Sequence, residues 1–252
     1  MSGLVLLHGF TGAPASFDEL SQTLRRRWPR LRVLCPSLLG HGATPEGAAR
    51  SFEQEVDRLA SVIRCAGFSG AHLCGYSLGA RLALGLLARH ACLFAGATLI
   101  GVHPGLTSEA ERAGRVGSDE RWCQLLEREG TPGFLRAWQA QPLFGTQARL
   151  SPAELARQAQ IRLAHSASGL QQSLRVLGLG QMPDLRGTLH VQPLQLQLLV
   201  GALDAKFCTI AQRLAATAPL ALEIVAGAGH NLLLEAPERV SRVLTRALEV
   251  QL

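Results

Sequence analysis

A strand-to-helix turn built around one serine sets the architecture of this chain. Residues 75–79 read Gly-Tyr-Ser-Leu-Gly, a G-x-S-x-G pattern between a strand-like apolar run at 71–74 and a helix-forming run at 80–84. In such a turn the central serine, Ser77, has strained backbone geometry, and its hydroxyl is exposed above the sheet edge. A glycine-rich turn whose serine only caps the next helix fits the same five residues. These five residues do not distinguish the two interpretations, so other parts of the sequence are needed to choose between them.

Strand-like and helix-like segments alternate on both sides of the turn. Apolar runs predict strands at 4–7, 32–36, 71–76, 97–102, 196–201 and 222–226. The runs between and after them predict helices at 17–27, 52–66, 80–89, 209–216 and 237–252. This alternation is typical of a parallel sheet with crossover helices on both faces. Because the sequence opens on the first strand, we expect any leading antiparallel hairpin to be reduced.

The alternation stops after the fourth predicted strand. Glycine and proline separate helical segments there, at 119–128, 133–139, 152–163 and 170–177. Helices inserted between two strands, just above the sheet edge that carries Ser77, would form a cap over the site. We therefore predict an α/β core of residues 1–103 and 194–252 and a helical cap of residues 104–193.

A serine hydroxyl becomes a useful nucleophile or base only when an imidazole takes its proton. His230 is the leading base, because it lies in a Gly-Ala-Gly-His-Asn loop directly after the last predicted strand. His72 lies within a strand, and His90, His165 and His190 lack such a loop. We expect His165 and His190 to face solvent.

An acid must orient that imidazole, and in this fold class the chain order is serine, acid, histidine. Asp204 follows the fifth predicted strand and fits this order, whereas Asp184 precedes the same strand. A simpler interpretation of Asp204 is that it caps the helix predicted from Thr209. Position and order together favour Asp204 as the acid.

Developing negative charge needs hydrogen-bond donors, and two backbone amides are well placed to supply them. The first strand ends in His-Gly-Phe, so the amide of Phe10 is one candidate, and the amide of Leu78 after the serine is the other. His41 lies in a second glycine-rich loop, after the second strand, and we interpret it as structural.

Composition limits the class of protein. A chain of 252 residues with 47% hydrophobic residues can bury one sizeable core. The apolar run at 4–7 is too short for a signal peptide or a membrane span, so we expect a cytoplasmic protein. Its scattered cysteines (Cys35, Cys65, Cys74, Cys92, Cys123 and Cys208) are interpreted as reduced residues that fill the core.

Charge indicates the chemistry of the partner. The formal net charge is +6, and Lys206 is the only lysine, so arginine supplies nearly all of the positive charge. The sequence contains no stripe of basic residues interleaved with aromatic ones, so no such pattern indicates binding to nucleic acid. Arginine binds carboxylates through two parallel hydrogen bonds, which permits an acidic small molecule as substrate.

These residues together resemble the α/β-hydrolase superfamily and, within it, the 2-succinyl-6-hydroxy-2,4-cyclohexadiene-1-carboxylate synthases of menaquinone biosynthesis. The resemblance runs over nearly the whole chain. Its matching segments are 8–10, 75–81, 103–106, 118–122, 138–144, 183–185, 204–207 and 229–231. The first and last are general to the superfamily, whereas Arg81, the His-Pro-Gly-Leu segment at 103–106 and Trp138 are more selective.

The resemblance implies a lyase that eliminates pyruvate from a succinylated cyclohexene, with Ser77, Asp204 and His230 as the triad. It implies no metal and no organic cofactor. It also implies a polycarboxylate substrate anchored by arginines and pocket-lining aromatic residues, here Arg81, Arg115, Arg162, Tyr76 and Trp138. The cap differs from the family in length around 164–168, close to Arg162. We expect a monomer or a small homo-oligomer.

Two alternative functions are compatible with the same residues. A carboxylesterase, thioesterase or carbon–carbon bond hydrolase has the same triad, since fold does not dictate reaction. A noncatalytic ligand-binding homologue is the second alternative, but such proteins commonly lose a triad member, and this chain retains a candidate for each.

Overall fold

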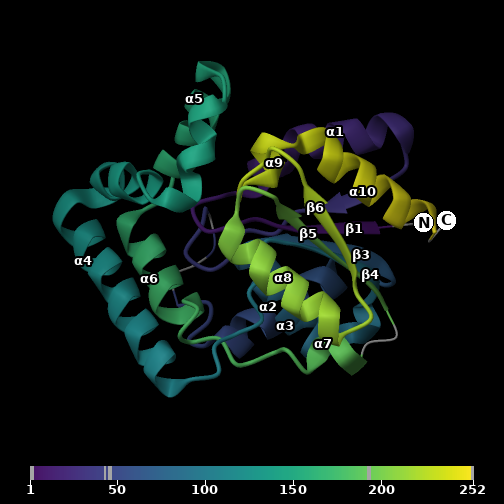
Figure 1. Ribbon diagram of the computed structural model, residues 1–252, viewed down its shortest axis with the longest axis horizontal. Helices are drawn as coiled ribbons and strands as arrows, with labels where there is room; N and C mark the ends of the chain where they lie inside the picture. Colours follow the sequence, from purple (N-terminus) through teal and green to yellow (C-terminus); the bar gives the residue numbers. More distant parts are fainter. Residues whose placement is uncertain (1–2, 43, 45–46, 192–193, 251–252) are drawn as a thin grey trace.

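The computed structural model describes residues 3–42, 44, 47–191 and 194–250 (Figure 1). Its sheet has six strands in the order β2-β1-β3-β4-β5-β6, and every neighbouring pair is parallel. The strands are β1 Gly3–Leu7, β2 Arg32–Leu34, β3 Ala71–Tyr76, β4 Phe94–Ile100, β5 Gln195–Gly201 and β6 Ala221–Val225. All six predicted strands are present, and the predicted α/β-hydrolase fold is confirmed.

Helices cover both faces of this sheet. They are α1 Asp18–Arg27, α2 Phe52–Cys65, α3 Leu78–His90, α7 Thr188–Val191, α8 Ala205–Thr217, α9 Leu232–Glu235 and α10 Pro237–Glu249, with the 3₁₀ segments η1 Pro14–Phe17 and η2 Ala91–Leu93. Figure 1 shows α1 and α10 together on one face and α2, α3 and α8 on the other. Helix α8 begins earlier than the predicted Thr209, because Asp204 already caps its first turn.

Alternation along β1 explains the two layers of the core. Val5 and Leu7 belong to the apolar cluster beneath α2 and α3, whereas Leu4 and Leu6 belong to the cluster beneath α1 and α10. All four side chains are fully buried. Because β1 has apolar residues on both of its faces, helices must cover both faces of the sheet.

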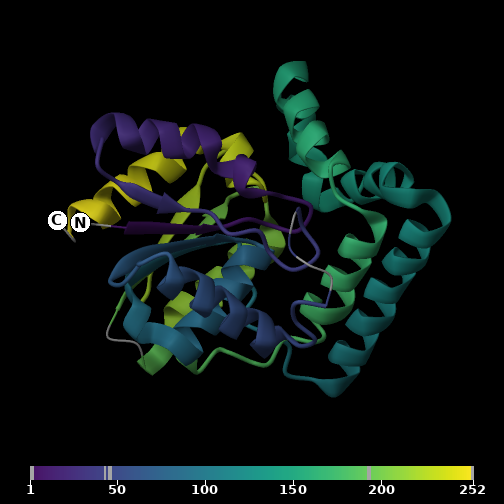
Figure 2. The ribbon, with the colours of Figure 1, turned by 180° about the vertical axis from the view of Figure 1, so that it is seen from behind.

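The segment between β4 and β5 lies beyond one end of the sheet. It contains α4 Glu109–Gln139, η3 Pro142–Arg149, α5 Pro152–Leu163 and α6 Ala167–Leu177. Both ribbon views show α4 and α6 side by side there, and α5 projecting next to them (Figures 1 and 2). The helix α4 is broken at Gly130, whose φ is 64°, and this break lies between the two helices predicted at 119–128 and 133–139. The division into core and cap stays a prediction, and residues 192–193 at its boundary lie outside the described residues.

The cysteine prediction was wrong in part. Cys74 and Cys123 are buried, but Cys65 and Cys92 are exposed near the ends of α2 and α3. All six cysteines are free thiols. A position within a predicted helix or strand does not by itself show whether a cysteine faces the core or the solvent. No helix within the described ranges is long and apolar enough to cross a membrane.

Candidate active site

The carboxyl ends of the strands bring distant segments to one edge of the sheet. Ser77 follows β3 and donates its backbone N–H to Ile100 O at 2.8 Å, at the end of β4. Gly101 in turn bonds Leu199 O of β5 at 3.0 Å, and Leu203 bonds Ala228 O after β6 at 2.9 Å. The turns that follow four strands are therefore joined by backbone hydrogen bonds, and ligands of open α/β sheets bind at such an edge.

The serine turn has strained backbone geometry. Ser77 has φ 52° and ψ −108°, a conformation that non-glycine residues rarely adopt. Its flanking glycines permit the close approach of α3 to the sheet. A Cβ on Gly79 would lie 2.0 Å from Leu7 O, and one on Gly75 would lie 2.4 Å from Gly79 O. The strained turn predicted around Ser77 is therefore present. Ser77 stands at the N-terminal cap position of α3, but its side chain makes no capping hydrogen bond.

Three predicted residues form a continuous chain of hydrogen bonds. His230 Nε2 lies 3.1 Å from Ser77 Oγ, and His230 Nδ1 lies 2.6 Å from Asp204 Oδ2. His230 is 3% exposed and Asp204 is 6% exposed. A carboxylate at Nδ1 fixes the tautomer whose free Nε2 can accept the serine proton.

Asp204 makes the contacts that both interpretations require. Its Oδ1 accepts the backbone N–H of Phe207 at 3.2 Å, while Oδ2 faces His230. Capping α8 therefore fixes the carboxylate in the position that orients the imidazole. The other acid, Asp184, forms an ion pair with Arg186 instead, at 2.7 Å.

The two predicted oxyanion donors line one cavity with the serine. Leu78 is the first residue of α3, so its amide has no acceptor inside the helix. The amide of Phe10 has no acceptor among the described residues. Phe10 and Leu78 both line a cavity that also contains Ser77, with Phe10 reaching it from the loop after β1.

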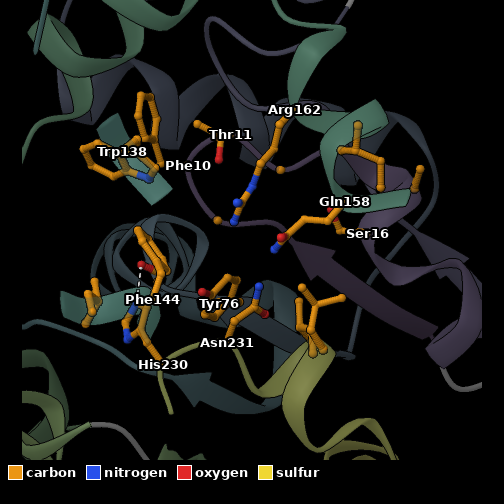
Figure 3. Close-up of a pocket in the computed structure, with 18 of the residues that line it drawn as sticks. Phe10, Thr11, Ser16, Tyr76, Trp138, Phe144, Gln158, Arg162, His230 and Asn231 are labelled. Atoms are coloured by element: carbon orange, nitrogen blue, oxygen red, sulfur yellow. Dashed lines mark hydrogen bonds between the residues drawn. The ribbon is translucent and has the colours of Figure 1, made fainter. Parts of the chain in front are cut away.

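Two cavities meet at Ser77, and each contains arginine. The larger, about 270 Å³, is lined by Arg81, Arg115, His103 and Lys206. The smaller, about 90 Å³, is lined by Tyr76, Gln158, Arg162 and Asn231 and is shown in Figure 3. Ser77, His230, Phe10, Leu143 and Trp138 line both. We call them the Arg81 chamber and the Arg162 chamber.

The three predicted arginines differ in their partners. Arg162 is 5% exposed, and its Nη1 has no hydrogen-bond partner among the described residues. Arg81 is half-buried and donates to the backbone oxygen of Leu177 at 2.7 Å, with no carboxylate partner among the described residues. Arg115 is paired with buried Asp119 at 2.8 Å. Burial lowers the pKa of the Arg162 guanidinium and of the Arg81 guanidinium, because each charge is poorly solvated.

Aromatic side chains separate the catalytic histidine candidate from solvent. The ring of Phe207 is centred 4.5 Å from that of His230, and Tyr76 lies at 5.5 Å. Trp138 of α4 packs against Phe10 at 5.1 Å, so α4 contacts the loop after β1 directly. Burial raises the pKa of the Tyr76 hydroxyl, which therefore stays protonated and is a donor.

The prediction that His165 faces solvent was wrong, whereas His190 is exposed. His165 is 5% exposed and stacks edge-on against His41, with ring centres 5.0 Å apart. His41 stacks in the same way on His8. No sequence pattern links these three residues, which come from three separate loops. Both nitrogens of His41 contact backbone groups, which is consistent with the structural role predicted for it.

We expect the folded chain to lose stability between pH 7 and pH 5 because of these imidazoles. Burial lowers the pKa of His8 to about 4, lowers that of His41 well below its ordinary value, and lowers that of His165. Since the unfolded pKa is about 6.5, the unfolded chain binds more protons in this range, at a cost of about 2 kcal/mol for an imidazole shifted as far as His8. Urea unfolding at both pH values measures the change.

The matched variant is His165→Gln, which keeps a donor and an acceptor but cannot titrate. Its free energy of unfolding should fall less between pH 7 and pH 5 than that of the parent chain. Burial also lowers the pKa values of His72 and His103 to about 4. These two residues therefore also reduce stability at pH 5, but they do so equally in the parent and the variant. Equal slopes in the parent and the variant would contradict the assignment to this cluster.

Sequence reasoning also missed residues that line the chambers. Thr11, Gln158 and Asn231 line the Arg162 chamber, and His103 and Lys206 line the Arg81 chamber. Thr11 and Asn231 immediately follow the predicted site residues Phe10 and His230, and this adjacency could have identified them. Gln158 lies one helical turn before Arg162 on α5, and only the fold reveals that this helix face meets the serine.

Comparison with known proteins identifies the family of this chain. The profile of the Alpha/beta hydrolase family matches residues 4–243. A 2-succinyl-6-hydroxy-2,4-cyclohexadiene-1-carboxylate synthase from Enterobacter sp. (strain 638) is 30% identical over 249 residues, which cover 99% of this chain and 92% of the relative. A putative synthase of the same name from Bacillus subtilis (strain 168) is 31% identical, with 97% and 89% covered.

Solved structures give the same result. MenH from S. aureus matches with a TM-score of 0.90 at 25% identity, covering 98% of this chain and 93% of that one. A thermophilic esterase from Thermogutta terrifontis shares the fold, with a TM-score of 0.81 at 24% identity, covering 99% and 90%. The chain therefore belongs to the alpha/beta hydrolase family, and over almost its whole length it is similar to 2-succinyl-6-hydroxy-2,4-cyclohexadiene-1-carboxylate synthases.

Proposed function

We propose that this protein is a lyase that eliminates pyruvate from 2-succinyl-5-enolpyruvyl-6-hydroxy-3-cyclohexene-1-carboxylate and gives 2-succinyl-6-hydroxy-2,4-cyclohexadiene-1-carboxylate, a step of menaquinone biosynthesis. The observation that carries the proposal is the pair of arginines on either side of Ser77. Arg81 and Arg162 are buried or half-buried, have no carboxylate partner among the described residues, and line the two chambers. A substrate with several carboxylates supplies the missing counter-charges. The named synthases among the relatives support the same reaction.

The chemistry requires a base and a site for negative charge. Proton loss from C2 of the ring starts the reaction, because the neighbouring ketone of the succinyl group stabilises the carbanion as an enolate. The electron pair then re-forms the ketone and creates the C2=C3 bond, the C3=C4 pair moves to C4–C5, and the C5–O bond breaks. The enolpyruvate that leaves takes up a proton and becomes pyruvate. Atoms and charge balance without an oxidant or a reductant.

Each step is assigned to residues of this chain. The Ser77 hydroxyl, whose proton His230 Nε2 accepts, takes the C2 proton, and Asp204 stabilises the imidazolium that forms. The amides of Phe10 and Leu78 donate to the enolate oxygen. Arg81, Arg162 and Tyr76 hold the carboxylates, Arg115 lines the Arg81 chamber while paired with Asp119, and Trp138 forms the wall shared by both chambers.

The direct test is pyruvate release. The purified protein is incubated with the enolpyruvyl substrate, and pyruvate is followed through lactate dehydrogenase and NADH. We expect turnover that depends on the protein. Ester cleavage without pyruvate release would support the carboxylesterase, thioesterase or carbon–carbon bond hydrolase alternative.

The variant Arg81→Ala separates the two reactions. It should lower kcat/KM for pyruvate release by about a hundredfold, because a partly buried charge contact to the substrate is lost. Hydrolysis of a neutral p-nitrophenyl ester should change by less than about threefold, since it needs the triad but no guanidinium. Equal losses in both assays would contradict carboxylate anchoring by Arg81.

A further inference from the structure

Thr11 has an unexpected backbone conformation. Its φ is 63°, and among the described residues Ser77 is the only other non-glycine residue with positive φ. The left-handed region is costly for a β-branched side chain, so surrounding contacts must hold it there. Strain of this kind at Ser77 belongs to the reacting hydroxyl. At Thr11 it has no role in the mechanism proposed above.

Two imidazoles hold the Thr11 backbone from opposite sides. His41 Nε2 accepts the Thr11 N–H at 3.1 Å, and His165 Nε2 donates to Thr11 O at 3.2 Å. The second nitrogen of each ring also has a backbone partner: His41 Nδ1 donates to Leu39 O at 3.0 Å, and His165 Nδ1 accepts from Gly42 N at 3.4 Å. These partners fix both tautomers. One imidazole comes from the loop after β2 and the other from the segment between α5 and α6.

The held conformation places the threonine hydroxyl at the Arg162 chamber. Thr11 is 1% exposed, lines that chamber, and its Oγ1 has no hydrogen-bond partner among the described residues. Arg162 Nη1 and Asn231 Oδ1 line the same chamber and also have none. Figure 3 shows Thr11 beside the Arg162 side chain, with Tyr76 and Asn231 facing them across the chamber. Buried polar atoms are normally satisfied, so the unsatisfied Thr11 hydroxyl and Arg162 nitrogen indicate a ligand that accepts hydrogen bonds, whereas Asn231 Oδ1 requires a donor.

We propose that Thr11 is a further substrate-binding residue, whose hydroxyl donates to an oxygen of the carboxylate that Arg162 holds. The proposal deepens the proposed function and rests on it only for the acidity of the substrate. A carboxylate oxygen fits because it satisfies both a hydroxyl donor and a buried guanidinium, whereas a neutral group leaves the guanidinium charge uncompensated. His41 and His165 are positioning residues, because they act on the substrate only through the Thr11 backbone.

Two matched pairs of variants isolate the hydroxyl. Thr11→Val removes it and keeps the branched side chain, while Thr11→Ser and Thr11→Ala differ from each other only in the hydroxyl oxygen. The probe is succinate, titrated into each protein by calorimetry, with succinamide as the uncharged control. We expect Val and Ala to weaken succinate binding about tenfold or more relative to Thr and Ser, as for a lost hydrogen bond to a charged group. Serine should bind within about threefold of the parent.

The outcomes separate this proposal from the proposed function. If the parent binds succinate and the pairs differ as stated, but no pyruvate is released from the enolpyruvyl substrate, the Thr11 site stands and the reaction assignment fails. If pyruvate is released, Thr11→Val should raise KM about tenfold and change kcat by less than about threefold. Equal succinate affinity within both pairs, or no succinate binding by the parent, would overturn the Thr11 proposal. Melting temperatures that agree within a pair exclude misfolding as the cause.

The clamp has its own test. His165→Ala should weaken succinate binding as Thr11→Val does, and the double variant should bind no more weakly than Thr11→Val alone, because both changes remove the same contact. His165→Gln keeps the donor to Thr11 O and should restore most of the affinity. Independent, multiplicative losses in the double variant would show that His165 does not act through Thr11.

Discussion

Replacement of Ser77 by alanine should lower the turnover of pyruvate release by about a thousandfold or more, with little change in substrate affinity. The hydroxyl is the atom placed 3.1 Å from the His230 imidazole, at the point where the two chambers meet. Members of a triad act as one unit, so losing any of them removes most of the proton-transfer chemistry. Steady-state kinetics with the coupled pyruvate assay give kcat and KM separately.

Two controls make this result specific. Ser118 also lines the Arg81 chamber but makes no hydrogen bond to His230, so Ser118→Ala should stay within about threefold of the parent. Asp204→Asn keeps an acceptor for the Phe207 amide but no longer fixes the imidazole tautomer, and should lose activity about a hundredfold or more. Full activity of Ser77→Ala in both the pyruvate and ester assays would revive the noncatalytic interpretation.

The fold and the chain of three side chains were predictable because both depend on local sequence and chain order. Apolar runs place the strands, and parallel strands bring their carboxyl ends to one edge, so residues directly after β3, β5 and β6 must meet there. Ser77, Asp204 and His230 are those residues. Glycines beside Ser77 and His230 marked the turns where backbone approaches backbone closely.

The chamber walls were much less predictable, because they depend on how helices between β4 and β5 pack. The sequence suggested that His165 faces solvent, yet the imidazole is buried where this segment meets two loops of the sheet edge. The sequence suggested Arg115 as a substrate anchor, and the structure pairs it with Asp119, four residues later on α4. The His165 contact leaves no periodic pattern, since it depends on distances between elements. The Arg115–Asp119 pair is different, because its i,i+4 spacing on one helix is present in the sequence.

Arg162 should show opposite effects on function and stability. Arg162→Met removes a guanidinium that is 5% exposed and has no ion-pair partner among the described residues. We expect KM for the enolpyruvyl substrate to rise about a hundredfold, because its carboxylate loses a buried counter-charge. We also expect the unliganded protein to gain about 1 kcal/mol, or about 2 to 4 °C in Tm, because the cost of a buried charge without an ion-pair partner exceeds the gain from its contact with the Phe144 ring.

Arg157 is the matched control for this experiment. It lines the same chamber from the same helix, but its side chain is half-exposed and it is paired with Glu19. Arg157→Met should therefore change KM by less than about threefold and leave Tm within about 1 °C, as expected for an exposed ion pair. A site that retains an unpaired buried charge sacrifices stability for affinity, so the two effects of Arg162→Met must occur together. A higher KM with a lower Tm would mean that Arg162 supports the fold rather than the substrate.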